Sequence, residues 1–174
     1  MLYASLADIP SGQSFSTGLI DPKQPVAAVL VGCYSGLGIH TTLKALGTFP
    51  DQFKGVLFIA AGVVDSSVMK EPDALEKLRE KTRIDLEKYV NLIRSQGMSA
   101  EYRIAFGTDV VEELEKLCLA AADQYPHTTF FAGQLVFERE RWYQSILHNE
   151  TAFALQRRLQ LSEQTLVILP ARMR

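Results

Sequence analysis

The sequence predicts an α/β protein, a three-layer α/β/α sandwich built around a five-stranded parallel sheet. Two observations support this fold. Short apolar runs alternate along the chain with longer segments whose apolar residues recur at helical spacing. Some of these runs, such as Val26–Val31, are apolar at every position, which is typical of strands covered on both faces by helices. A regular strand–helix alternation requires parallel strands, because each crossover carries a helix from one strand to the next.

The expected elements are bounded by turn residues. The strands lie at Val26–Val31, Val56–Val64, Glu101–Phe106, Thr128–Ala132 and Thr165–Leu169. The helices are expected to run from Ser35 to Gly47, from Pro72 to Gly97, from Thr108 to Ala121 and over Thr151–Leu159. Thr108 is expected to cap the third helix, and Asn149 or Thr151 the last one, because a side-chain oxygen at a helix start accepts hydrogen bonds from free backbone amides.

Residues 1–25 differ in composition from the rest of the chain. Proline, glycine and serine recur from Pro10 to Pro25, and a segment of this kind buries too little apolar surface to fold by itself. We therefore expect a linker or strap at 1–25 and one compact α/β domain at 26–174. A length of 174 residues is in keeping with a single domain.

Composition and charge exclude several classes of protein. The 18 basic and 20 acidic residues give a net charge of −2, which is too little positive charge for a nucleic-acid partner. Cys33 and Cys118 form no CxxC pair, which excludes a disulfide scaffold and a cysteine-rich zinc site. The sequence has the pattern of neither a signal peptide nor a membrane span, so we expect a cytoplasmic protein.

A ligand site is expected at the carboxyl ends of the strands, where open α/β sheets bind their ligands. Glycine lets a ligand approach the backbone there, and helix N-termini offer free amides that suit phosphate. Asp65 is a candidate for ribose or base contacts, and Arg139 or Arg141 for holding phosphate. The same residue types also occur in ordinary turns and caps. The candidate ligand-binding residues are Gly32, Ser35, Gly36, Gly38, Val63, Asp65, Gly107, Asp109, Gly133, Arg139, Arg141, Asn149 and Thr151.

No catalytic motif is complete. Tyr34 occupies the position at which a nucleophile elbow, GxSxG, requires serine, and the P-loop pattern does not occur. The three histidines stand at unrelated positions, so no metal site is expected. Ser35 and Cys33 are potential nucleophiles, but no base accompanies either one at a recognisable spacing. We therefore expect a protein that is not an enzyme, and a hydrolase is the least favoured alternative.

With this order of elements, residues 25–171 resemble the universal stress protein family. The resemblance implies a Rossmann-like fold of the adenine nucleotide alpha hydrolase type. That family commonly binds ATP through an acidic residue after the first strand and a GxxG motif followed nine residues later by Gly-Ser or Gly-Thr. Here the turn Gly32–Ser35 has no acidic residue, Val136 stands at the second glycine of GxxG, and Asn149–Thr151 replaces the last motif. The resemblance thus implies a lost or altered ATP site and no cofactor, with another nucleotide left open.

Several local strings are similar to the soluble domain that follows the membrane segment of some bacterial amino acid permeases, which are APC-type transporters. These strings lie at Ser16–Pro22, Gly36–Thr41, Gly107–Glu112, Glu140–Tyr143 and Leu147–Thr151. The resemblance implies a covalently attached transporter segment. Residues 1–25 would then be its tether at the cytoplasmic face of the inner membrane.

Two functional hypotheses follow from these observations. The first is a non-enzymatic cytoplasmic regulatory domain of an amino acid permease-type transporter, with a degenerate ATP site. Such a domain would bind a small ligand and bias the transporter's conformations. The alternative is a free-standing universal stress-type protein that binds a nucleotide in a remodelled pocket. The family resemblance further implies a homodimer through the last strand, Thr165–Leu169, whose apolar edge would favour pairing.

Overall fold

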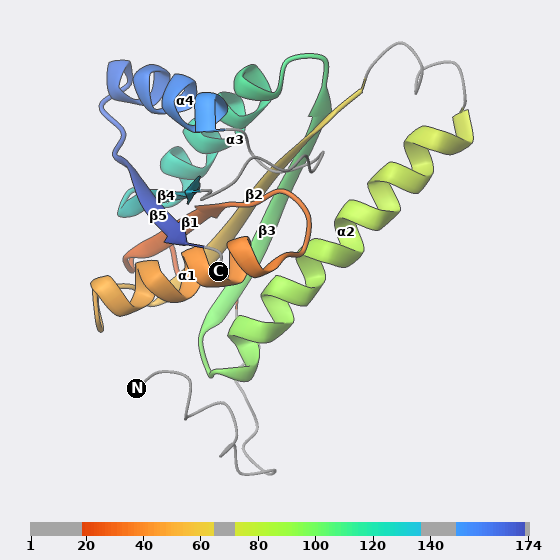
Figure 1. The fold of residues 1–174 in the computed structure, drawn as a ribbon. Helices are drawn as coiled ribbons and strands as arrows, with labels where there is room; N and C mark the ends of the chain where they lie inside the picture. The colour runs from red at the N-terminus through yellow and green to blue at the C-terminus, as the bar shows by residue number, and fades with distance from the viewer. Residues whose placement is uncertain (1–18, 65–71, 137–148, 173–174) are drawn as a thin grey trace.

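The computed structural model describes residues 19–64, 72–136 and 149–172, and these form an α/β/α sandwich (Figure 1). The elements in chain order are β1 (Val26–Leu30), α1 (Gly36–Thr48), β2 (Gly55–Val63), α2 (Pro72–Ser95), β3 (Ser99–Gly107), α3 (Val110–Gln124), β4 (Thr128–Val136), α4 (Asn149–Leu161) and β5 (Leu166–Arg172).

The sheet confirms the predicted α/β fold. Its five strands are parallel and lie in the order β3-β2-β1-β4-β5. Helices α1 and α2 cover one face and α3 and α4 cover the other, which gives three layers (Figure 1). The chain runs outward from β1 to β3 and then returns to place β4 on the other side of β1. The strand order therefore reverses between β1 and β4.

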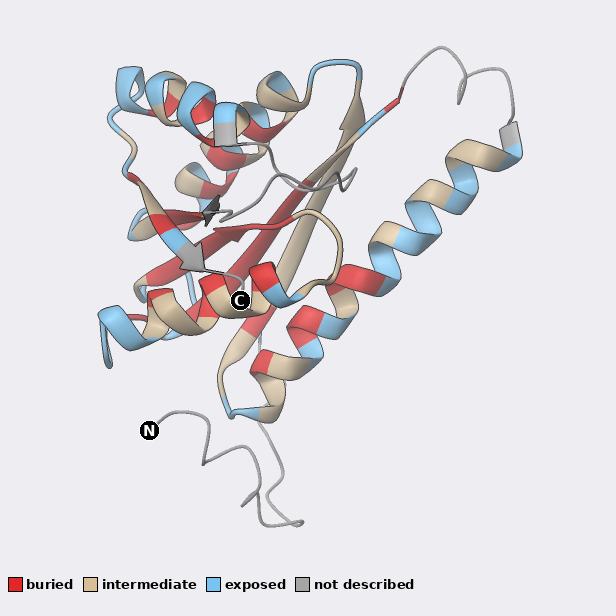
Figure 2. Cartoon of the chain, viewed as in Figure 1, coloured by how far each residue is buried: buried red, intermediate tan, exposed pale blue. Residues whose placement is uncertain are grey.

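The position of β1 explains why its sequence is apolar throughout. All of its residues are buried (Figure 2). Val26, Ala28 and Leu30 join the apolar cluster beneath α3 and α4, whereas Ala27 and Val29 join the cluster beneath α1 and α2. Because successive side chains of a strand point to opposite faces, a central strand covered on both faces needs apolar residues at every position.

The last two strands are longer than the sequence predicts. β4 extends to Val136 rather than Ala132, and β5 extends to Arg172 rather than Leu169. Pro170 is expected to close β5, but an edge strand accommodates a proline whose missing N–H lies away from the neighbouring strand. The prediction therefore located both strands correctly and placed their ends too early.

Two predicted helix caps are wrong. Asp109, not Thr108, is the N-cap of α3, and its carboxylate accepts hydrogen bonds from the amides of Val111 and Glu112 at 2.9 and 3.1 Å. Helix α4 begins at Asn149, so Thr151 lies within its first turn instead of capping it, and Asn149, the other predicted cap, is the first residue of the helix. A helix start that shifts by one or two residues is enough to move the capping position.

The chain joins the core before β1 begins. Ile20 is 4% exposed and belongs to the cluster beneath α3 and α4. Its side chain lies against Gly55, where an added Cβ would stand 3.0 Å from Ile20 Cγ2. The packed part of the molecule thus includes a residue of the segment that the sequence assigns to a linker.

Candidate ligand-binding site at the end of β1

The carboxyl end of β1 lies where the strand order reverses. Its last residue, Leu30, pairs with both neighbouring strands. Beyond that level β2 continues through Ala60–Val63 and β4 continues through Gly133–Val136. We call the turn Val31–Ser35, together with these two strand extensions, the β1 end. This is the topological switch point at which open α/β sheets bind ligands.

The turn of the β1 end is held by α2. The phenol oxygen of Tyr89 accepts a hydrogen bond from the Ser35 amide at 3.1 Å and donates one to the Cys33 carbonyl at 2.9 Å. Tyr89 is 1% exposed, and burial raises the pKa of its phenol, which keeps the hydroxyl protonated and able to donate. Because one side chain bonds two backbone groups of the turn, the conformation of the turn depends on the position of α2.

Aromatic and charged side chains surround this contact. The Tyr89 ring stacks on Phe58 of β2 with 5.0 Å between centroids and packs against Tyr34 of the turn at 4.8 Å. The Lys88 ammonium lies 5.5 Å from the Tyr34 ring centroid and 3.2 Å from a carboxylate oxygen of Asp85, a residue that is 9% exposed. Helix α2 therefore supplies a buried carboxylate and an ammonium beside a turn that has no charged residue of its own.

The sequence pattern does not indicate that these residues of α2 belong to the site. The apolar spacing of α2 marks Tyr89 as a core residue, and the Ser35 amide that bonds Tyr89 lies 54 residues away in sequence. No local spacing connects two groups so far apart. The available signal was the hydroxyl itself, because a tyrosine in a buried stripe needs a hydrogen-bond partner.

The candidate glycines of the β1 end have two different roles. A Cβ added to Gly38 would stand 1.9 Å from the Tyr89 phenol oxygen, and one added to Gly133 would stand 2.2 Å from Thr41 Oγ1. These two glycines allow α1 to lie closely against α2 and β4. Gly36 is exposed at the first position of α1, and a Cβ there would meet no atom of the described residues within 4 Å. Of the three, Gly36 is the one where a Cβ would meet no neighbour in the part of the chain that the structure describes.

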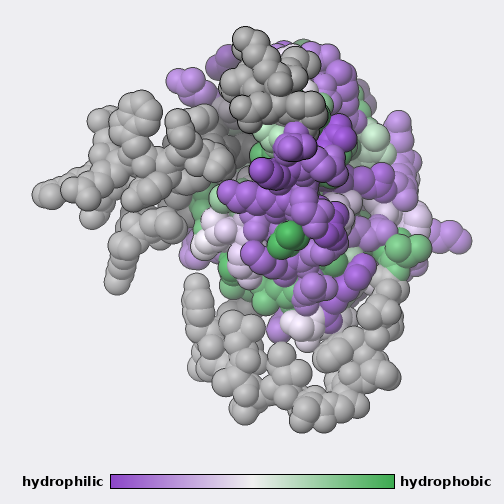
Figure 3. Space-filling model, turned by 90° about the vertical axis from the view of Figure 1, so that its right-hand side faces the viewer, coloured by the Kyte–Doolittle hydropathy of each residue, from purple (hydrophilic) through white to green (hydrophobic). Residues whose placement is uncertain are grey.

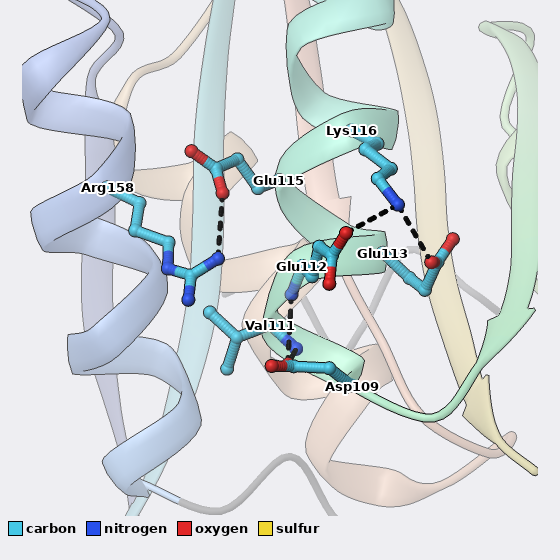
Figure 4. Close-up of polar contacts among 7 residues, drawn as sticks. All are labelled: Asp109, Val111, Glu112, Glu113, Glu115, Lys116 and Arg158. Atoms are coloured by element: carbon cyan, nitrogen blue, oxygen red, sulfur yellow. Dashed lines mark hydrogen bonds and ion pairs between the residues drawn. The ribbon is translucent and has the colours of Figure 1, made fainter.

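Two of the candidate side chains cap helices. Ser35 is the N-cap of α1, and its Oγ accepts a hydrogen bond from the Gly38 amide at 3.4 Å. Asp109 caps α3 in the same way (Figure 4). Both side chains therefore have a structural task at the carboxyl edge of the sheet, as the alternative interpretation of the turn residues anticipated.

The remaining candidates lie along the same edge or outside the described residues. Val63 ends β2, is 51% exposed and pairs with Gly107 at the end of β3. Gly32 is half-buried within the turn, and Thr151 is half-buried in α4. Asn149 is described only as the first residue of α4. Three predicted site residues lie outside the described residues: Asp65, Arg139 and Arg141.

Helices α3 and α4 close the opposite face of the sheet as a connected pair. Arg158 of α4 donates to Glu115 of α3 at 2.9 Å, and within α3 Lys116 pairs with Glu112 at 2.8 Å (Figure 4). Beneath them Cys118 is fully buried, and burial raises the pKa of its thiol to about 12. Cys118 is therefore a packing residue, because the reactive form of cysteine is the thiolate.

The outward face of α2 is hydrophilic (Figure 3). Arg83 forms ion pairs with Glu80 and Glu87 on this helix, and Ile84 is exposed among them. Balanced charge of this kind is typical of a helix face in contact with water. In the ranges that the structure describes, no helix is both long and apolar enough to cross a membrane.

The fold is that of solved universal stress proteins. The chain is similar to a protein of the universal stress protein family from Burkholderia pseudomallei, with a TM-score of 0.59, 18% identity, and coverage of 84% of this chain and 96% of that chain. It is also similar to a universal stress protein from Archaeoglobus fulgidus, with a TM-score of 0.52, 11% identity, and coverage of 84% and 93%. No protein-family model and no curated protein matches the sequence. At these identities the similarity establishes a universal stress protein-like fold.

Proposed function

We propose that this chain is a non-enzymatic, ligand-sensing domain and that it binds a small ligand at the β1 end. The observation that carries the proposal is the coincidence of three features at one place. The strand order reverses there, both neighbouring strands extend beyond β1, and the first residue of α1, Gly36, is exposed with no described neighbour where its Cβ would stand. Free amides at the start of α1 favour an anionic group on the ligand.

The described side chains of the β1 end support binding rather than catalysis. Ser35 Oγ serves as a helix cap, and the Tyr89 hydroxyl is committed to the backbone of the turn. Asp85 is paired with Lys88. A nucleophile needs an adjacent base within hydrogen-bond reach. Within the described ranges the partner of Ser35 Oγ is the Gly38 amide, which is not a base, and Cys33 bonds Tyr89 through its backbone carbonyl and not through its thiol.

Calorimetry of the purified chain tests ligand binding directly. ATP, ADP, AMP and free amino acids are titrated separately at millimolar concentration, and the ligand is recovered afterwards. We expect heat from at least one of these compounds, which is recovered chemically intact. Turnover of the recovered compound would contradict a non-enzymatic role, and the absence of heat from every compound would contradict sensing of these ligand classes.

The variant Gly36→Glu locates the binding. A larger side chain fits at this position, and an acidic residue at a helix start does not harm the helix. The new carboxylate should repel an anionic ligand and abolish its heat. Gln96→Glu adds the same charge at an exposed position beyond the end of α2 and should leave binding unchanged. Equal binding by wild type and Gly36→Glu would place the ligand elsewhere.

The proposed role of this sensing is regulation of an amino acid permease-type transporter from its cytoplasmic face, by a homodimer formed through the β5 edge. The local strings shared with permease domains support the transporter. The edge position of β5 and the apolar residues Val167 and Ile168 support the dimer. A ligand that binds one arrangement of the domain more tightly than another would bias the transporter by that difference in affinity.

A free-standing stress-type protein that binds a nucleotide is the second candidate. One observation favours it: the similarity covers 96% and 93% of the two solved stress proteins, so this chain contains nearly their whole length. In that case the β1 end would bind the nucleotide with α2 supplying Asp85 in place of an acidic residue in the turn. The calorimetric titrations distinguish the two candidate functions. Heat from an adenine nucleotide but not from an amino acid would favour the stress-type protein.

A further inference from the structure

β5 is an edge strand, so the backbone groups on one of its sides point away from the neighbouring strand β4. The Phe130 amide donates to the Thr165 carbonyl at 3.0 Å, and Phe130 pairs in register with Leu166. In a parallel ladder, alternate residues of a strand direct their backbone groups to the same neighbour. The odd-numbered residues from 165 onward therefore face β4. The residues of β5 that direct their backbone groups outward are Leu166, Ile168, Pro170 and Arg172.

Side chains from both faces of the sheet reach this outward edge. The ammonium of Lys44, on α1, donates to the Pro170 carbonyl at 2.8 Å. The side-chain amide of Gln156, on α4, donates to the Leu166 carbonyl at 2.9 Å. Pro170 has no N–H to donate. Of the outward carbonyls, that of Pro170 thus accepts a hydrogen bond from Lys44 and that of Leu166 accepts one from Gln156, and Ile168 lies between these two positions.

A second copy of this chain fits the edge in one antiparallel register. With Ile168 opposite Ile168, each Ile168 amide donates to the other's carbonyl, and each Leu166 amide donates to the Pro170 carbonyl across the axis. The Leu166 carbonyl then faces a proline that cannot donate to it, and Gln156 of its own chain satisfies it instead. In a register with Val167 opposite Val167, the Ile168 amide of the second copy would compete with Gln156 for the Leu166 carbonyl, so this register is disfavoured.

We propose that Lys44 is a gate on this edge and that Gln156 and Pro170 set the register of the dimer. The Lys44 ammonium bonds the Pro170 carbonyl that the Leu166 amide of a second copy would also use, and it places a charged group at the outward edge. The two donors compete for this carbonyl, so pairing of two copies is weaker while Lys44 is in place and stronger when it withdraws. Gln156 has the opposite effect, because it completes the register centred on Ile168. This inference rests on the homodimer of the proposed function and gives that dimer a register and a control.

Apolar side chains beside the edge fit the same partner. Val167 and Ile168 are half-buried on the two faces of β5. Phe153 is 44% exposed and stands three residues before Gln156, on the side of α4 that reaches β5. These side chains would pack against their counterparts when two edges pair.

Sedimentation equilibrium of single variants tests the gate. Lys44→Met keeps the aliphatic stem and removes the donor, and we expect at least a tenfold lower dimer dissociation constant than wild type. Gln156→Ala should not tighten the dimer. Lys54→Met removes an exposed lysine just before β2 and should match wild type. An unchanged dissociation constant for Lys44→Met, or an equal tightening by Gln156→Ala, would overturn the gate.

Cysteine cross-linking in the Lys44→Met background tests the register, with Cys33→Ser included to remove a partly exposed thiol. Residues opposite each other in a hydrogen-bonded antiparallel pair have Cα atoms about 5.5 Å apart, within the range of a disulfide. Ile168→Cys should therefore form covalent dimers on oxidation, and Val167→Cys should not. The reverse pattern would refute the register. If the chain dimerises with the same dissociation constant in wild type and Lys44→Met, only the gate is overturned. If the chain stays monomeric in every variant, both the gate and the proposed homodimer are overturned.

Discussion

The hydroxyl of Tyr89 connects two backbone groups of the β1 end to α2. In Tyr89→Phe the ring contacts with Phe58 and Tyr34 remain, but the Ser35 amide and the Cys33 carbonyl lose their partner. Leaving such part-buried groups unsatisfied costs about 1–3 kcal/mol. We expect the free energy of unfolding in urea to fall by this amount and the Ser35 amide to exchange faster with solvent.

Tyr34→Phe is the matched control for this variant. It keeps the ring that packs on Tyr89 at 4.8 Å and removes a hydroxyl from the same cluster. The free energy of unfolding should change little. An equal loss of stability in Tyr34→Phe and Tyr89→Phe would show that the turn does not depend on the Tyr89 hydroxyl.

Two glycines of the β1 end should respond differently to the same substitution. In Gly133→Ala the new methyl group would stand 2.2 Å from Thr41 Oγ1 and 3.1 Å from Leu37 Cδ1, so α1 must move away from β4. Overpacking of this kind destabilises by about 1–3 kcal/mol. Gly36→Ala meets no described atom within 4 Å and should be neutral or slightly stabilising. Thermal unfolding of both variants measures the difference, and equal melting temperatures would refute a packing role for Gly133.

At the scale of the helix, the start of α3 depends on one carboxylate. Asp109→Ala removes the acceptor for the amides of Val111 and Glu112, and we expect a loss of about 0.5–2 kcal/mol in the free energy of unfolding. Thr108→Ala alters the residue that the sequence alone suggests as the cap, and it should cost less. Urea denaturation of the two variants decides between them. A greater loss in Thr108→Ala would restore the sequence-based assignment.

The elements themselves were predictable because each one carries its own pattern. Val26–Leu30 is apolar at every position because helices cover both of its faces, and α3 shows its buried stripe at Leu114, Cys118 and Ala121. Element ends were less predictable. Asp109 and Thr108 are both good caps, and only the backbone geometry at Asp109 distinguishes them. Pro170 is a helix or strand breaker in most settings, and only the edge position of β5 accommodates it.

The location of the site was predictable, and the tasks of its residues were not. Strand ends and the strand–helix alternation place a ligand site at the carboxyl edge of the sheet. The closeness of Gly133 to Thr41, and of Tyr89 to Ser35, depends on how α1 and α2 lie on the sheet. Contacts of that kind join segments far apart in sequence, so periodicity and local motifs do not predict them.

At the scale of the whole molecule, the buried thiol of Cys118 makes stability depend on pH. Burial raises its pKa from 9.0 to about 12, so the folded chain holds this proton more tightly than the unfolded chain. The associated stability is complete below about pH 9 and is lost as the pH rises toward 12. Between pH 7 and pH 10 we expect this thiol to account for a loss of roughly 1–2 kcal/mol.

Urea denaturation at pH 7 and pH 10 measures this loss. The decrease in the free energy of unfolding between the two pH values should be smaller in Cys118→Ala than in wild type. Cys33→Ala is the matched control, because it removes the other cysteine and retains Cys118. A decrease in Cys118→Ala as large as in wild type would show that the buried thiol does not cause the pH dependence.

Helix α1 joins the two surfaces to which we assign a function. Its first residue, Gly36, belongs to the open part of the ligand site, and Lys44 on the same helix holds the outward carbonyl of Pro170. A ligand that favours one position of α1 would therefore also favour one state of the β5 edge. By linkage, dimer formation would change ligand affinity by the same factor.

An immunoblot of fractionated cells, with an antibody raised against this domain, tests the proposed transporter role most directly. Cells of the organism that encodes the chain are separated into membrane and soluble fractions, and the apparent mass of the reactive band is compared with the 19.4 kDa of this chain. We expect a band much heavier than 19.4 kDa in the membrane fraction. A band of 19.4 kDa in the soluble fraction would contradict the transporter and favour a free-standing stress-type protein.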